Sequence, residues 1–150
     1  MTPRAVPTST AVTITLPFPY PELSPNSRCG WRAKAAAVKA YRYECKVETL
    51  NFYYAAYGTA REWKKPVAPI EVTITFILID KRRQDWDNLL ASFKAGIDGI
   101  VDAGLLPDDD VRSWSPTLRY EQGAVAGVRV ELTDGGAEAT ALAVNARRLT

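Results

Sequence analysis

Two aspartates one residue apart, Asp85 and Asp87, follow three cationic residues in the stretch KRRQDWDNL. Cationic neighbours keep carboxyl groups ionised at neutral pH. A hard cation such as Mg²⁺ binds to one or two protein carboxylates together with waters and substrate phosphate oxygens. On an extended backbone the two side chains share one face, so this aspartate pair is a candidate magnesium site. The alternative is a helix cap, because Asp at a helix start accepts backbone N–H bonds and complements the dipole.

A second acidic group, Asp108 to Asp110, follows the helix expected after the pair. Its like charges repel one another, and a bound cation relieves that repulsion, although such residues are also ordinary turn material. The intervening helix is about 24 Å long. One chain can therefore join the two groups only if the helix breaks at Gly96 or Gly99, or if the loop folds far back. In a symmetric dimer, two antiparallel copies of this helix place the start of one helix beside the end of the other. We therefore predict a composite site with the aspartate pair from one subunit and Asp109 from the other.

Lys94 lies seven residues after Asp87, about two turns along the same helical face, and Asp98 follows at i+4. A lysine at this place is suited to hold a scissile phosphate or to stabilise charge that develops on it. The alternative is a surface ion pair with Asp98, contributing about 0.5 kcal/mol or less. Position alone favours the ion pair.

Histidine is absent from the 150 residues. This excludes Ser-His-Asp and Cys-His nucleophilic catalysis in their usual forms and removes the commonest zinc ligand. The net charge of +2 is too small to indicate a partner by itself. Nothing marks a secreted disulfide scaffold, so we expect Cys29 and Cys45 to be reduced packing residues. Without an apolar membrane span or signal-peptide centre, we expect a cytoplasmic protein with no membrane partner.

Hydrophobic periodicity predicts the elements that position these groups. The expected strands are residues 12–16, 70–79, 117–120 and 125–132, and the expected helices are residues 31–57, with room for one break, and 88–103. The strand at 70–79 becomes wholly apolar at its end, which predicts a central strand, and Gly104 is the expected helix stop. We therefore predict one α+β domain over residues 1–132, with a small mixed β-sheet packed with two main helices. The tail, residues 133–150, is expected to be poorly ordered.

The first expected helix and the residues before it are basic, with Glu44 as the one acidic residue up to Lys46. The cationic residues are Arg28, Arg32, Lys34, Lys39, Arg42 and Lys46, interleaved with Trp31, Tyr41 and Tyr43. Cations among aromatics are typical of a surface that follows a phosphate backbone. A solvated helix face with its aromatics in the core is the alternative, and this feature alone favours it.

The order of several pieces resembles a known family. The pieces are a strand ending in LPFP, the loop ELSPNSR, a basic helix, a strand, DWDNL, a lysine-bearing helix, GLLPDDDV and a closing strand. Over residues 12–132 they resemble the RusA family of Holliday-junction resolvases, small endonucleases common in phages and prophages. The resemblance implies a homodimeric, RusA-like nuclease that uses Mg²⁺, with Mn²⁺ as a second possibility, to nick four-way DNA junctions at two symmetric positions.

The resemblance also assigns roles to residues. The catalytic and metal-binding aspartates fall on Asp85, Asp87 and Asp109, with Asp108 as a neighbouring ligand, and the catalytic lysine falls on Lys94. Family members are understood to need dimerisation to complete the metal site.

Two departures from the family pattern concern the lysine and the loop. The lysine often lies three residues after the Asn, where this chain has Ala91; Lys94 comes one turn later, and Asp98 and the acidic run shift equally. We interpret this as a one-turn insertion that keeps the helical face. Gly30 stands where related sequences often carry His before the Trp, which weakens a role of the loop in substrate contact.

DNA contacts are expected from Lys81, Arg82 and Arg83 and from the basic residues Arg28, Arg32, Lys34 and Lys39. A non-catalytic branched-DNA-binding protein, whose acidic groups are caps and turns, is an alternative. An enzyme that holds a nucleotide-sugar metal through D-x-D is a third hypothesis, although the short chain leaves little room for a donor domain.

Overall fold

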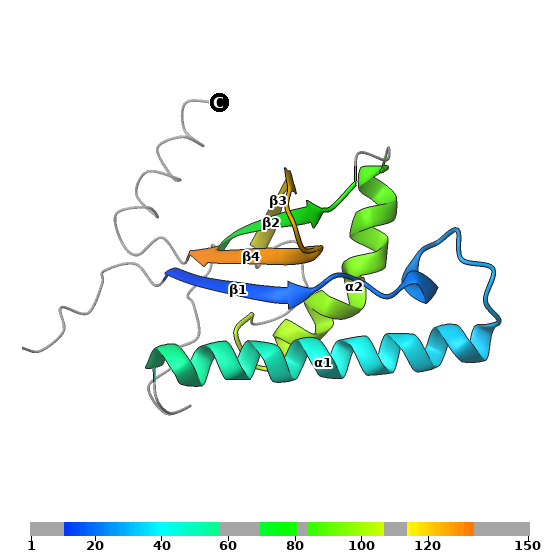
Figure 1. The fold of residues 1–150 in the computed structure, drawn as a ribbon. Helices are drawn as coiled ribbons and strands as arrows, with labels where there is room; N and C mark the ends of the chain where they lie inside the picture. Colours follow the sequence, from blue (N-terminus) through cyan, green and yellow to red (C-terminus); the bar gives the residue numbers. More distant parts are fainter. Residues whose placement is uncertain (1–10, 58–69, 81–83, 107–113, 134–150) are drawn as a thin grey trace, which may run out of the picture.

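The computed structural model describes residues 11–57, 70–80, 84–106 and 114–133 as one α+β domain with two helices and a four-stranded mixed sheet (Figure 1). The strands are β1 (Ala11–Pro17), β2 (Ile70–Leu78), β3 (Trp114–Gln122) and β4 (Gly127–Thr133). The helices are α1 (Trp31–Tyr57) and α2 (Trp86–Asp102), with one short 3₁₀ turn, η1 (Pro21–Leu23). The predicted α+β class, with a small mixed sheet and two main helices, is confirmed. Of the predicted tail, residues 133–150, Thr133 is the last residue of β4 and the rest lies outside the described residues. Neither helix in the described ranges is long and apolar enough to cross a membrane.

The sheet has the strand order β1-β4-β2-β3, so β2 is central as predicted. β4 is antiparallel to both β1 and β2, and β3 is parallel to β2. The short connection from β3 to β4 therefore passes the end of β2, which is inserted between the two strands. The Gly123 N–H donates to the Leu78 carbonyl at 3.0 Å, which fixes this connection to the last residue of β2.

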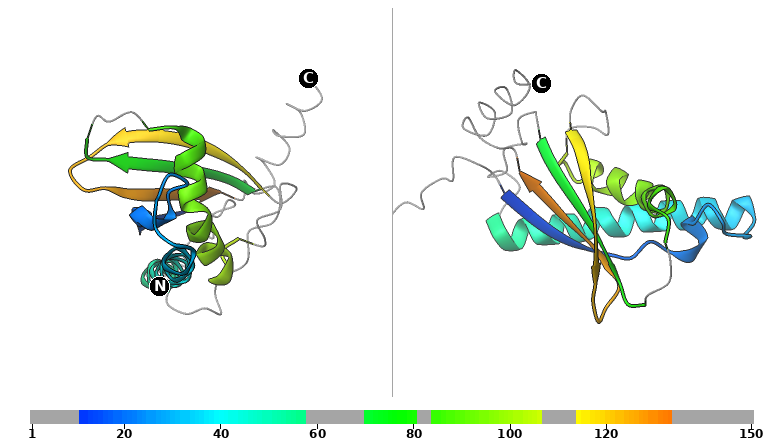
Figure 2. Two further views of the ribbon diagram at one scale, coloured as in Figure 1. Left: turned by 90° about the vertical axis from the view of Figure 1, so that its right-hand side faces the viewer. Right: turned by 90° about the horizontal axis from the view of Figure 1, so that it is seen from above.

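One face of the sheet is apolar because the strand registers align β-branched and aromatic residues across three strands. The aligned rows are Val12, Leu132 and Val72; Ile14, Val130 and Ile74; and Leu16, Val128 and Phe76, all of them buried. Phe93 of α2 packs on this face, with its ring 6.0 Å from that of Phe76. In the left panel of Figure 2, α2 crosses the strands and its C-terminal end lies beside α1.

The helix α1 runs without a break over the predicted range. Its buried side chains recur every fourth residue, at Ala37, Tyr41, Cys45, Thr49 and Tyr53, which places one stripe against the fold. The Tyr41 hydroxyl donates to the Pro17 carbonyl at 2.6 Å, and the Tyr20 hydroxyl donates to Glu44. These two bonds tie the proline-rich loop after β1 to the middle of α1.

The helix α2 begins at Trp86, two residues before the predicted start, and Gly104 follows its end with a φ of 89°. The helix does not break at Gly96 or Gly99, which was one of the two conditions under which a single chain could join the acidic groups, because it includes both glycines. These glycines serve packing instead. A Cβ on Gly96 would lie 2.5 Å from the Phe93 ring, and a Cβ on Gly99 would lie 2.5 Å from the carbonyl oxygen of Arg42 on α1.

Candidate metal and DNA-binding site

The aspartate pair lies at the junction between the central strand and α2. Asp85 occupies the N-cap position with extended backbone angles, and its carbonyl accepts the first helical bond from the Leu89 N–H at 3.0 Å. Asp87 is already in the first helical turn. The premise that both residues lie on extended backbone is therefore wrong, because the helix begins between them at Trp86.

The cap interpretation of Asp85 is also not what the structure shows. Its side chain makes no capping hydrogen bond, although the residue holds the N-cap position. Both Asp85 and Asp87 are exposed, and no residue in the described ranges bonds to or pairs with either carboxylate. Asp87 still lies where a negative charge complements the helix dipole. The structure thus presents two adjacent carboxylates that are not used in holding the fold.

These two carboxylates fit part of a magnesium site. Mg²⁺ takes oxygen ligands and is usually held by one or two carboxylates with waters and substrate phosphates. Within the described part of the chain, no three His, Cys, Asp or Glu residues gather closely enough to hold an ion. Asp108, Asp109 and Asp110, which were predicted to complete the site, lie outside the described residues.

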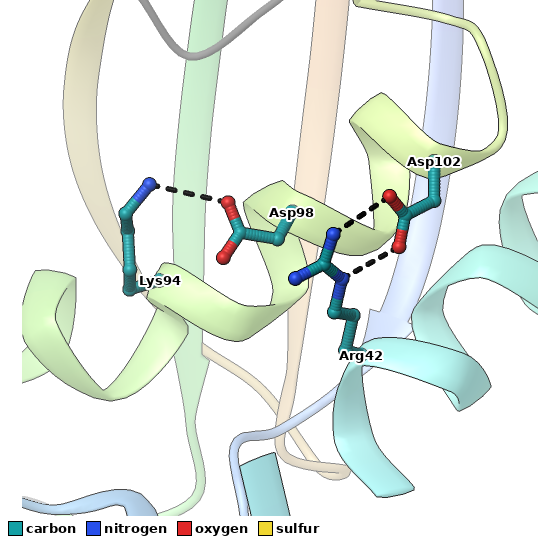
Figure 3. Close-up of polar contacts among 4 residues, drawn as sticks. All are labelled: Arg42, Lys94, Asp98 and Asp102. Carbon is teal, nitrogen blue, oxygen red and sulfur yellow. Dashed lines mark hydrogen bonds and ion pairs between the residues drawn. The ribbon is translucent and has the colours of Figure 1, made fainter. Parts of the chain in front are cut away.

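Lys94 is 55% exposed, and its Nζ lies 3.2 Å from Oδ1 of Asp98 (Figure 3). The surface ion pair expected from the i,i+4 spacing is therefore present. The lysine lies about 10 Å along the helix axis from Asp87, and it points toward Asp98 at the next turn. For the Lys94 amine to contact a phosphate, this exposed ion pair would have to open.

Arg42 of α1 forms a bidentate ion pair with Asp102 at the end of α2, with N–O distances of 2.6 and 2.8 Å (Figure 3). The guanidinium lowers the pKa of the Asp102 carboxyl below its ordinary value, mainly through these hydrogen bonds. Bidentate pairs of this kind are the stronger ones. The pair joins the two helices, so Arg42 has a structural role that its place among the basic residues of the sequence did not indicate.

The other cations of the N-terminal basic region remain on the surface. Arg28, Arg32, Lys34 and Lys39 are all exposed. The aromatics divide: Tyr41 is fully buried, as the core interpretation requires, whereas Trp31 and Tyr43 are 75% and 67% exposed. The Arg32 guanidinium lies 5.2 Å from the centre of the Trp31 ring. Lys81, Arg82 and Arg83, the other predicted DNA contacts, lie outside the described residues.

Two exposed aromatic residues that neighbour Phe76 were not singled out by the sequence. Trp86, between the aspartates, is 45% exposed and its ring lies 6.4 Å from that of buried Phe76. Tyr120 of the edge strand β3 is the register partner of Phe76 and is 50% exposed. Both therefore border the same buried ring. Trp86 could have been recognised from the sequence because it stands between the two aspartates. Tyr120 could not, because its position beside Phe76 depends on the strand register.

The cysteines do not pair with each other. Cys45 is buried in the stripe of α1 that faces the fold, and this burial raises the pKa of its thiol to about 12. Cys29 is partly exposed, with its sulfur 3.8 Å from the Glu22 carbonyl. The expectation of reduced thiols is confirmed, and the packing role holds most clearly for Cys45.

Comparison of the chain with models of known protein families finds no match. A protein of Xylella fastidiosa (strain Temecula1 / ATCC 700964), named "Uncharacterized protein", is 33% identical to this chain over 114 residues. The matched region is 76% of this chain and 70% of the relative.

Proposed function

The chain belongs to the same family as the Xylella fastidiosa protein, and we propose that it is a metal-dependent endonuclease that resolves four-way DNA junctions by paired, symmetric phosphodiester hydrolysis. The observation that carries the proposal is Asp85, which holds an N-cap position while its carboxylate caps nothing. A second exposed carboxylate, Asp87, follows at the start of the helix. The ordered resemblance to the RusA family supports the same proposal and extends it to a phage or prophage enzyme in a bacterial cytoplasm.

The proposed chemistry assigns a task to each group. Asp85 and Asp87 would hold Mg²⁺, or Mn²⁺ in its place, with Asp109 and its neighbour Asp108 supplied by a second subunit. When bound, the metal supplies Lewis-acid stabilisation of the phosphate charge and a water of lowered pKa. Lys94 would leave Asp98 to contact the scissile phosphate. No histidine is needed as a base in this scheme, which agrees with the composition.

Cationic side chains would hold the polyanion against the acidic site. The expected contacts are Lys81, Arg82 and Arg83 directly before the aspartate pair, together with Arg28, Arg32, Lys34 and Lys39. Each phosphate contact releases condensed counterions, so we expect binding to weaken steeply as salt is raised. The positive neighbourhood of the carboxylates then serves substrate binding, while the carboxylates serve the metal.

Replacing Asp87 with Asn tests the proposal directly. The change removes a charge from the metal site and keeps the side-chain shape, so junction cleavage should fall by at least about 10³-fold while junction binding is kept or tightened. Asp102→Asn is the matched control, because it changes an aspartate at the other end of the same helix that pairs with Arg42 and with no proposed catalytic residue. Cleavage by Asp87→Asn at the wild-type rate would refute the metal role.

Mixing two inactive variants tests the composite site. In a mixed dimer of Asp87→Asn and Asp109→Asn chains, a site shared between subunits combines both changes at one position and leaves the other site intact. Cleavage should therefore return, as single nicks in place of paired ones. If each subunit instead contains a complete site, every site in the mixed dimer carries one change and no cleavage returns.

A non-catalytic branched-DNA-binding protein is the second candidate. It is favoured by the absence of a group of three ligating side chains within the described ranges and by the place of Asp87 in the first helical turn. This function predicts junction affinity that is indifferent to Mg²⁺, with no nicking. The Asp87→Asn comparison separates the two candidates, because only a nuclease has cleavage to lose.

A further inference from the structure

Three cations of α1 form a straight row. Arg32, Lys39 and Lys46 are seven residues apart, so they lie on one side of the helix at intervals of about 10 Å. We call these residues the basic row. Arg32 and Lys39 are exposed and Lys46 is partly exposed, and none of the three forms an ion pair with an acidic residue of the described ranges. Lys34 is not part of the row, because two residues of α-helix turn its side chain by about 200° from that of Arg32.

The row continues onto α2 through the ion pairs drawn in Figure 3. Arg42 lies between Lys39 and Lys46 on the same side of α1 and holds Asp102. The pKa of the Asp102 carboxyl is lowered mainly by Arg42 and also by the nearby positive charge of Lys46. The pKa of the Arg42 guanidinium is raised mainly by Asp102 and also by the nearby negative charge of Asp98. Asp98 in turn pairs with Lys94 (Figure 3). The basic row and Lys94 therefore border one continuous surface formed by the two helices.

The charges on this surface are unevenly compensated. Two of the three carboxylates of α2, Asp98 and Asp102, are each paired with a cation outside the row. The sequence from residue 28 to residue 43 has no acidic side chain at all. Arg32 and Lys39 therefore have no acidic neighbour within the first helical turns, whereas Lys46 stands between Glu44 and Glu48. The three cations together span about 21 Å, which equals the axial length of roughly six nucleotides of one DNA strand.

We propose that the basic row binds the phosphate backbone of a DNA arm and leads it across the two helices toward Lys94 and the aspartate pair. The identity of the polyanion rests on the proposed function, whereas the position of the basic row does not. A second copy of the chain fits this row less well, because a two-fold axis through the row would set equal positive charges against each other.

Salt-dependent binding tests the proposal. The probe is a fluorescently labelled four-way junction in buffer containing EDTA, so that cleavage plays no part. The double variant Lys39→Gln with Lys46→Gln removes two charges and keeps most of each side-chain stem. The slope of log K against log salt should become shallower by about 1.8, which is about 0.9 for each lost phosphate contact. Arg119→Gln, which removes an exposed charge of β3 on the sheet face opposite Phe76 and the helices, is the control and should leave the slope unchanged.

Each result decides the proposal. A shallower slope for the double variant alone, at an unchanged melting temperature, supports it. Equal slopes for wild type and double variant would overturn it, as would a slope reduced by about 0.9 in Arg119→Gln. A change in sedimenting mass with an unchanged slope would show instead that the basic row contacts a second copy. The cleavage assay with Asp87→Asn tests the metal site, whereas the salt slope measured in EDTA tests the basic row. Failure of this proposal can therefore be distinguished from failure of the proposed function.

Discussion

Adding one methyl group at Gly99 should separate the two helices that carry the proposed site. A Cβ there would lie 2.5 Å from the Arg42 carbonyl oxygen and 2.9 Å from Cβ of Cys45. Ordinary contacts are about 3.5–4.0 Å, so α1 and α2 must move apart by about 1 Å. Overpacking of this kind costs on the order of 3 kcal/mol when the opposing atoms are backbone, and the better helix propensity of Ala offsets about 1 kcal/mol.

We therefore expect Gly99→Ala to lower the free energy of unfolding by about 2 kcal/mol, which for a domain of this size shifts the melting temperature by roughly 4–8 °C. Urea unfolding followed by circular dichroism measures the change. Gly30→Ala is the matched control, because its added Cβ meets no atom within 4 Å, and its effect should stay below about 1 kcal/mol. A Gly99→Ala protein as stable as wild type would show that the helices do not approach this closely.

Two further predictions concern titratable groups. The pKa of Asp102 is lowered in the folded state, so its pair with Arg42 stabilises the fold above the ordinary carboxyl pKa of 3.8 and is lost as pH falls through the folded value. Asp102→Asn should therefore destabilise the protein by about 0.5–1 kcal/mol at neutral pH, and the difference from wild type should shrink toward zero in urea titrations as pH falls from about 5 toward about 2. An undiminished difference in acid would contradict the ion-pair origin. Burial raises the pKa of Cys45 to about 12, so a thiol reagent near pH 8 should label Cys29 in the native protein and both cysteines only after unfolding. Rapid native labelling of Cys45 would contradict the packing around it.

Local pattern predicted much of the fold. The Ala-rich, Gly-free segment gave both ends of α1, and the apolar run from residue 70 indicated a central strand, because these signals are carried by consecutive residues. Gly104 ended α2 as its backbone freedom predicts. Phe93 and Ile100 stand seven residues apart, which places them on one face of that helix, and both are buried.

Features set by tertiary contacts were harder to predict. A glycine inside a helix favours a break on propensity alone, and only the approach of α1 shows that Gly99 makes room for a neighbouring backbone. Likewise, Arg42 looked like another surface cation until Asp102, sixty residues away, was placed beside it. Asp in a first turn usually indicates a cap, and the uncapped geometry of Asp85 depends on side-chain direction, which spacing does not determine.

The most direct test of the central claim is cleavage of a labelled four-way junction by wild-type protein, compared with a linear duplex of the same sequence, with and without Mg²⁺. If Asp85 and Asp87 hold a catalytic metal, paired symmetric nicks should appear in the junction alone and only when Mg²⁺ or Mn²⁺ is present. Binding to the junction with no nicks under either metal would contradict the nuclease and leave a branched-DNA-binding protein.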